Sequence, residues 1–133
     1  MLDTDICSYI IKKRPVTVLK SMEARVLDKH ILCISAITYA ELRLGATRSG
    51  NPQKIHGLIT AFCDRLHDVL PWDVQAAGNF AELQATLFAK GSPIGPNDTL
   101  IAAHALGLDA VLVTNNHKHF SKVPGLELEN WIK

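Results

Sequence analysis

Short apolar runs alternate along this chain with longer stretches in which apolar residues recur every three or four positions. The runs are rich in valine, isoleucine and leucine, which is typical of strands that are buried on both faces of a parallel sheet. They predict short strands at residues 1–2, 31–34, 68–70, 110–113 and 126–128.

The intervening stretches predict helices, because their apolar residues fall on one helical face. Ser35, Asn51 and Asp73 stand where N-caps are expected, and Pro15, Pro52 and Pro96 stand near predicted helix starts, where proline is tolerated. The predicted apolar stripes are Ile6, Tyr9, Ile10; Leu19, Met22, Val26; Ile37, Ala40, Leu44; Ile55, Leu58, Ile59, Phe62, Leu66; Ala76, Phe80, Leu83, Leu87; and Ile101, Ala102, Ala105.

This alternation predicts an α/β fold with a mainly parallel sheet of four to five short strands between two layers of helices, a three-layer α/β/α arrangement. We expect it to form one domain over residues 1–133. In such sheets the ligand site lies beyond the carboxyl ends of the strands. Asp3 and the segment 114–116 follow two of the predicted strands.

Acidic residues near these strand ends have two interpretations each. Asp3 or Thr4 can be a helix cap, and Asp5 a first-turn acid that favours the helix dipole. Glu41 falls on the predicted stripe 37–44, where a buried charge needs a partner, which an ordinary ion pair along the helix would supply. Asp98 follows Pro96 in a predicted first turn, where acids are also favoured.

Taken together, Asp3, Glu41 and Asp98 can form one pocket of oxygen ligands without histidine or cysteine. Carboxylate oxygens suit Mg²⁺ or Mn²⁺ rather than zinc, and three close carboxylates repel one another until a cation binds. The matching chemistry is metal-assisted displacement at a phosphate. Thr114, Asn115 and Asn116 form either a turn or a further wall of this pocket.

Composition limits the class of protein but does not indicate a binding partner. The chain has 133 residues, 47% of them hydrophobic, and a net charge of +1, so it folds but carries no overall electrostatic signature of nucleic-acid binding. Cys7, Cys33 and Cys63 lie in separate apolar segments and are expected to be buried thiols. No apolar run approaches the ~18 residues of a membrane helix and no signal segment is evident, so we expect a soluble, cytoplasmic protein without membrane contact.

Basic residues are clustered locally, and they are the candidates for phosphate contacts. Each is equally explained as solvated helix surface. The candidates are Lys12, Lys13, Arg14, Arg43, Arg48 and His117.

Four motifs in order give the chain a resemblance to a known family. They are Leu2-Asp3-Thr4-Asp5-Ile6; residues 34–42, ISAITYAEL; residues 93–105, PIGPNDTLIAAHA; and residues 113–120, VTNNHKHF. Together they resemble a PIN domain, and more closely the VapC-type toxins of bacterial toxin–antitoxin pairs. The similarity spans essentially the whole chain.

The resemblance implies a small α/β/α domain that is a Mg²⁺- or Mn²⁺-dependent endoribonuclease, with Asp3, Glu41 and Asp98 as catalytic metal ligands. The family's fourth acid matches Asn116, so this sequence departs from the commonest pattern there and holds one charge less. Asp5 stands where many relatives carry asparagine and could restore part of that charge. Thr114 and Asn115 would play supporting roles.

Partners are also implied. Such toxins are silenced by a cognate VapB-type antitoxin, form homodimers, and meet operator DNA only through the antitoxin. Their substrates are structured RNAs, usually tRNA, and residues 95–96 and 114–116 resemble the enteric group that cuts initiator tRNA. Two alternatives stay open: a catalytically degenerate PIN-like module that binds RNA or protein, which Asn116 favours, and a structure-specific DNA nuclease, a class that is usually larger.

Overall fold

Strands and helices alternate along the chain, as the apolar pattern predicts. The computed structural model describes residues 1–132. Its elements are α1 (Thr4–Lys12), α2 (Val16–Leu27), β1 (Cys33–Ser35), α3 (Ala36–Thr47), α4 (Pro52–Asp64), β2 (Asp68–Leu70), α5 (Val74–Ala89), α6 (Pro96–Gly107), β3 (Leu112–Val113), α7 (His117–Phe120) and β4 (Leu128–Glu129).

The N-terminal segment joins two pairs of parallel strands into one sheet. β1 pairs with β2, and β3 pairs with β4, both in parallel. Between them, Leu2 N donates to Cys33 O at 3.0 Å and Asp3 N donates to Val113 O at 3.0 Å. The spatial order is therefore β2, β1, residues 1–3, β3 and β4, which confirms the predicted short-stranded parallel sheet.

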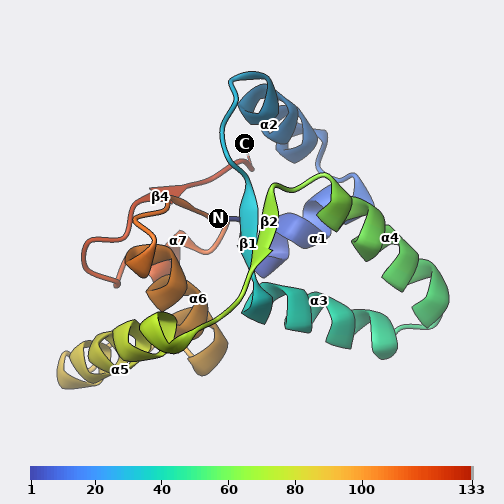
Figure 1. Cartoon of the computed structure of the whole chain (residues 1–133). Helices are drawn as coiled ribbons and strands as arrows, with labels where there is room; N and C mark the ends of the chain where they lie inside the picture. The colour runs from blue at the N-terminus through green and yellow to red at the C-terminus, as the bar shows by residue number, and fades with distance from the viewer. Residues whose placement is uncertain (133) are drawn as a thin grey trace.

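Helices cover both faces of this sheet (Figure 1). α1, α3 and α4 lie on one side and α5, α6 and α7 on the other, with α2 at one end. A hydrophobic core fills each side: the first includes Leu2, Ile6, Met22, Ile34, Ile59 and Phe62, and the second includes Leu83, Leu87, Ile101, Ala102, Leu112 and Phe120. The predicted three-layer α/β/α fold is confirmed.

Local capping chemistry fixes the helix starts where the sequence placed them. The side chain of Ser35 accepts from Ile37 N at 3.1 Å, and that of Asp73 accepts from Ala76 N at 3.0 Å. Asn51 caps α4 in the same way. These side chains satisfy amide groups that have no partner within their helices.

Some predicted positions were wrong. Ile31 is 76% exposed and lies outside the strand, which begins at Cys33 because that residue is the first to meet β2. The last strand lies at Leu128–Glu129, slightly beyond the predicted 126–128. Val26 and Leu58 are also exposed, since their helices pack through neighbouring positions.

The buried face of α3 also differs from the predicted stripe. Ala40 and Leu44 are exposed, whereas Thr38, Leu42 and Ala46 are buried. α3 packs against both α1 and α4, and this pair of neighbours selects a face turned away from the one that apolar spacing alone suggested.

Among the described residues, the prediction of buried thiols is confirmed for two of the three cysteines. Cys7 and Cys33 are buried free thiols, and Cys63 is a half-buried one. Within residues 1–132, no helix combines the length and the apolar character that crossing a bilayer requires.

Candidate active site at the carboxyl edge of the sheet

Asp3 follows the central segment of the sheet and is the N-cap of α1. Its Oδ1 atom accepts from Ile6 N at 2.9 Å, and the residue is only 5% exposed. Burial raises the pKa of Asp3 to about 6, while hydrogen bonds from Thr114 and Ile6 act in the opposite direction. The nearby charges of Asp5 and Asp98 raise it further. The capping interpretation is therefore confirmed, and it leaves the carboxylate facing other acids.

Glu41 is half-buried and is oriented by two donors. The Thr4 hydroxyl donates to its Oε1 at 2.6 Å, and Asn97 Nδ2 donates to its Oε2 at 3.2 Å. These donors come from α1 and α6, so Glu41 connects three helices at one edge of the sheet. Its charge raises the pKa of Asp98, which places the two acids within electrostatic reach of each other.

The predicted apolar stripe that drew attention to Glu41 is only partly correct. The stripe that contained it is not the buried face of α3, since Ala40 and Leu44 beside it are exposed. The alternative interpretation of Glu41, an ordinary ion pair along its helix, is also absent: among residues 1–132, no ion pair joins Glu41 to Arg43 or Arg48. What the position has instead is a pair of neutral hydrogen-bond donors.

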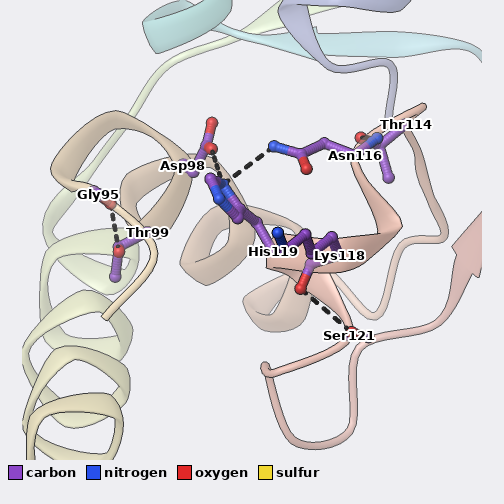
Figure 2. A network of polar contacts seen from close by, with 8 residues as sticks. All are labelled: Gly95, Asp98, Thr99, Thr114, Asn116, Lys118, His119 and Ser121. Carbon is purple, nitrogen blue, oxygen red and sulfur yellow. Dashed lines mark hydrogen bonds and ion pairs between the residues drawn. The ribbon is translucent and has the colours of Figure 1, made fainter. Parts of the chain in front are cut away.

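Asp98 lies in the first turn of α6 and faces α7. Its Oδ2 atom is 3.6 Å from His119 Nδ1, and a dashed line joins the two side chains in Figure 2. Burial raises the pKa of Asp98, the hydrogen bond and charge of His119 lower it, and the charges of Glu41 and Asp5 raise it. The mutual effect of these acids is the repulsion that a shared cation would relieve.

His119, from the segment after β3, faces Asp98, and Asn116 contacts His119 in turn. Asn116 Nδ2 lies 3.0 Å from His119 Nδ1, and the amide group points toward the imidazole in Figure 2. His117, which the sequence predicts only as a candidate for phosphate contact, is exposed, and that prediction stays open. His119 was missed; its signal was a histidine three residues after Asn116, a spacing that faces it once α7 forms.

The supporting candidates Thr114 and Asn115 differ in burial and in hydrogen-bond partners. Thr114 is buried, accepts from Asn116 N at 2.9 Å and hydrogen-bonds Asp3, so it connects the two sides of the site. Asn115 is exposed and its Oδ1 accepts from Asn130 Nδ2 at 3.1 Å, so its side chain is engaged with the C-terminal segment. Asp5 is an exposed first-turn acid, and its charge acts on the carboxylates of the site.

Most of the basic candidates surround the end of α1 and the end of α3. Lys12, Lys13 and Arg14 are exposed, with Lys13 in the left-handed conformation that closes α1. Arg48 is the exposed C-cap of α3. All four are free to contact solvent.

Arg43, by contrast, holds α3 and α4 together. Its guanidinium donates to the backbone oxygen of His56 at 3.0 Å and to Thr60 Oγ1 at 3.0 Å, and it lies 4.9 Å from the centre of the Tyr39 ring. These contacts join α3 to α4, which makes Arg43 a weaker candidate for RNA phosphate than its charge suggested.

The donor set fits a hydrated divalent cation. Asp3, Glu41 and Asp98 offer only oxygen; burial chiefly raises the pKa of Asp3 and Asp98, and the charges of neighbouring acids add to it. Within residues 1–132, no three His, Cys, Asp or Glu side chains converge tightly enough to enclose an ion directly. Mg²⁺ usually keeps several of its waters and uses few direct carboxylates, so this open arrangement suits it.

A largely apolar groove opens beside Glu41. It has a volume of about 390 Å³ and lies between α1, α3 and α4. Its polar lining includes Thr4, Lys12 and Glu41, and its apolar lining includes Ile11, Leu42, Ile55, Leu58 and Ile59.

Comparison with known proteins gives consistent matches over the whole chain. The PIN domain model matches residues 1–126. The tRNA(fMet)-specific endonuclease VapC of Salmonella typhimurium is 39% identical over 131 residues, covering 98% of this chain and 96% of the relative. Ribonuclease VapC2 of Rickettsia felis is 38% identical over 133 residues, covering 100% of this chain and 98% of the relative.

Comparison with solved structures points to the same family. VapBC2 from Rickettsia felis, bound to a DNA fragment from its promoter, matches with a TM-score of 0.92 and 37% identity over 99% of this chain and 98% of the other. DNA-bound VapBC from Salmonella typhimurium matches with a TM-score of 0.91 and 37% identity over 99% of this chain and 97% of the other.

Proposed function

Because this chain belongs to the PIN-domain family and, within it, to the VapC ribonucleases, we propose that it is a metal-dependent endoribonuclease toxin. The observation that supports the proposal is electrostatic: burial first, and then the charges of Asp5 and Asp98, raise the pKa of Asp3, while burial and then the charges of Glu41 and Asp5 raise the pKa of Asp98. Such a site attracts a divalent cation and, through it, a phosphate.

Each acid has a distinct support in the proposed mechanism. Asp3, Glu41 and Asp98 would hold Mg²⁺ or Mn²⁺, which supplies an activated water and stabilises the charge that develops on the phosphate. The hydrogen bonds from Ile6 and Thr114 fix the direction of the Asp3 carboxylate, and those in which Thr4 and Asn97 donate do the same for Glu41. Such preorganisation reduces the reorganisation that the reaction requires.

The proposed substrate is a tRNA, with initiator tRNA as the specific candidate. A relative named for tRNA(fMet) cleavage is 39% identical over nearly the whole length of both chains, which supports this choice. Sequencing of RNA ends after brief induction in cells tests it: new ends within one tRNA are expected, whereas ends spread over many messenger RNAs would contradict the assignment.

The proposed partner is a VapB-type antitoxin. The groove beside Glu41 suits an amphipathic segment, whose apolar side chains would fill the walls while a basic side chain reaches the carboxylates. Operator DNA would be met only through that antitoxin, in the cytoplasm, and the toxin would form a homodimer. The matched structures of VapBC bound to DNA support the proposed antitoxin partner and its contact with DNA.

Cleavage assays on the purified protein test the reaction. Activity on tRNA should require Mg²⁺ or Mn²⁺, disappear in chelator, and fall at least about a hundredfold in Asp98→Asn, since the ion loses a charged ligand. Asp109→Asn is the matched control, because Asp109 is exposed and has a left-handed backbone that asparagine tolerates. Cleavage that persists in chelator would overturn the proposed mechanism.

A binding module that has lost catalysis is the second candidate, and Asn116 at the place of the fourth acid is the observation that favours it. Calorimetric titration with Mn²⁺ separates the two. An active enzyme should bind Mn²⁺ in a manner that depends on Asp3 and Glu41, and a degenerate module should not.

A further inference from the structure

The outer face of α5 is apolar although it is open to solvent. This helix of 16 residues lies along the outside of the molecule and packs on α6 through Ala76, Leu83 and Leu87, which are buried (Figure 1). On its opposite side, exposed uncharged residues recur every three or four positions over the whole length of the helix. These residues, the α5 stripe, are Val74, Ala77, Gly78, Ala81, Ala85 and Phe88.

The α5 stripe differs from an ordinary solvated helix face, which usually carries charged residues. Between Val74 and Ala89 the only charged residue is Glu82, which lies beside the stripe. The side chains of Val74 and Phe88 are 88% and 61% exposed. Their spacing and that of the small residues between them is the spacing of a seam at which one helix contacts another.

Gly78 gives an independent indication that a second helix approaches this face. A Cβ atom placed on Gly78 would find no atom of a neighbouring element within 4 Å, so packing within one chain does not require glycine there. Glycine is unfavourable inside a helix, but it allows another backbone to come close. Ala77 and Ala81 extend this low surface on either side.

The order of residues along the α5 stripe suits a second α5 that runs in the opposite direction. The large residues Val74 and Phe88 stand at its two ends, and Ala81 stands midway between them. With a two-fold axis at Ala81, Val74 of each copy lies at the level of Phe88 of the other, and the small residues meet in the middle. A contact between identical subunits across a two-fold axis requires a face that is complementary to itself in this way.

The charges at the ends of α5 favour the same direction. Asp73 caps the amino end and Lys90 the carboxyl end, and both residues are exposed. An antiparallel pair brings Asp73 of one copy to the end at which the other copy carries Lys90, whereas a parallel pair would bring like charges together. The helix dipoles also attract each other only in the antiparallel arrangement.

We propose that the α5 stripe is the interface of a homodimer, in which α5 of a second copy packs across it in the antiparallel direction. The inference rests on the proposed function for the expectation of a homodimer, and it specifies the face at which the two copies meet. Because α6 packs on α5 and carries Asp98, this interface lies one helix away from the proposed active site.

Sedimentation velocity of the full-length protein, at concentrations from about 1 to about 100 µM, tests the proposal. Wild-type protein should form a dimer. Ala81→Glu should raise the dissociation constant of the dimer at least about a hundredfold, because two carboxylates would meet at the two-fold axis. Ala81 is exposed in the single chain, so the variant should keep the circular dichroism spectrum of the wild type.

Ala24→Glu is the matched control. Ala24 is also an exposed alanine inside a helix, and the substitution adds the same charge. It lies on α2, at the other end of the molecule, where Val26 and Leu27 form a different exposed apolar surface (Figure 1). The control should leave the dissociation constant unchanged.

Disulfide trapping tests the direction of packing without a repulsive substitution. Under mild oxidation, Ala81→Cys should form a covalent dimer, and so should a mixture of Val74→Cys and Phe88→Cys. Ala85→Cys alone should stay at the wild-type background, which the half-buried Cys63 sets, because its two copies would be about 12 Å apart along the helix axes.

The outcomes separate this inference from the proposed function, because tRNA cleavage is measured independently in each variant. A wild-type protein that stays monomeric, or a dimer that Ala24→Glu weakens as much as Ala81→Glu does, would overturn the α5 interface and leave the proposed nuclease intact. Trapping of Ala85→Cys but not of Ala81→Cys would also overturn the interface. A dimer with the expected behaviour but without metal-dependent cleavage would support the interface and overturn the nuclease.

Discussion

Asp3 combines burial with a charge that the metal-free protein does not neutralise. Its pKa rises from an ordinary value of 3.8 to about 6, chiefly through burial. The folded state thus binds the Asp3 proton more tightly than the unfolded chain does. Folding stability is highest when Asp3 is protonated and is lost as the pH rises between about 4 and about 6, the reverse of the usual behaviour of a paired carboxylate.

Asp3→Asn should therefore stabilise the metal-free protein above pH 6. The expected gain at pH 7.5 is up to about 3 kcal/mol, which corresponds to a pKa shift of about two units. Asparagine retains the capping oxygen for Ile6 N, so the helix start is preserved. Urea unfolding in chelator at pH 4 and pH 7.5 measures the difference. Near pH 4 the gain should disappear; a variant that is less stable than wild type at pH 7.5 would contradict the prediction.

Three side-chain contacts of the site could not be predicted from the sequence. Motifs and family resemblance predict Asp3, Glu41 and Asp98 as site residues, but they do not predict the donors to Glu41, because Thr4 and Asn97 are 37 and 56 positions away from it. Which of several polar neighbours meets a carboxylate depends on helix rotation, and apolar spacing gives that only approximately. His119 was missed for the same reason, since its orientation depends on the short helix α7.

At the scale of elements, a buried hydrogen bond fixes α6 against the start of α3. His104 Nδ1 lies 2.8 Å from Ser35 Oγ, and both residues are buried. Ser35 also caps α3 through Ile37 N. Since α3 carries Glu41 and α6 carries Asp98, this contact sets the relative position of two proposed metal ligands.

Ser35→Ala should destabilise the protein by about 2–3 kcal/mol, because it removes an N-cap and leaves a buried imidazole nitrogen without a partner. Urea unfolding measures the loss. Ser21→Ala, at a half-buried position on α2, is the control and should stay within about 0.5 kcal/mol of wild type. Equal effects of the two substitutions would show that the contact with His104 contributes little.

Elements with local signals were predictable, and those that depend on distant partners were not. β2 was predicted at its exact bounds, and the caps Ser35, Asn51 and Asp73 all act as expected. The exposed side of α3 was assigned wrongly because two neighbouring helices choose its buried face, and α7 was overlooked because four residues carry no periodicity.

At the scale of the whole molecule, the first three residues unite the sheet, both cores and the site. Residues 1–3 hydrogen-bond β1 on one side and β3 on the other. Met1 belongs to one hydrophobic core and Leu2 to the other. The segment then ends at Asp3, so packing around Leu2 and the position of the proposed ligand are mechanically connected.

Leu2→Ala should accordingly affect stability and metal binding together. Leu2 is fully buried, so the truncation should cost about 3 kcal/mol through lost burial and the cavity that remains. It should also loosen the hydrogen bonds of residues 2 and 3 to both neighbours, which hydrogen exchange at Leu2, Asp3 and Val113 amides would detect, and weaken Mn²⁺ binding in calorimetry.

Leu27→Ala is the matched control, because Leu27 is 81% exposed and the same atoms are removed without leaving a cavity. It should change the unfolding free energy by less than about 0.5 kcal/mol and leave Mn²⁺ binding unchanged. If Leu2→Ala lowered stability by the expected amount but left Mn²⁺ binding and the exchange of the Asp3 amide untouched, the proposed connection between the core and the site would be wrong. The sheet would then hold Asp3 in place through its backbone alone.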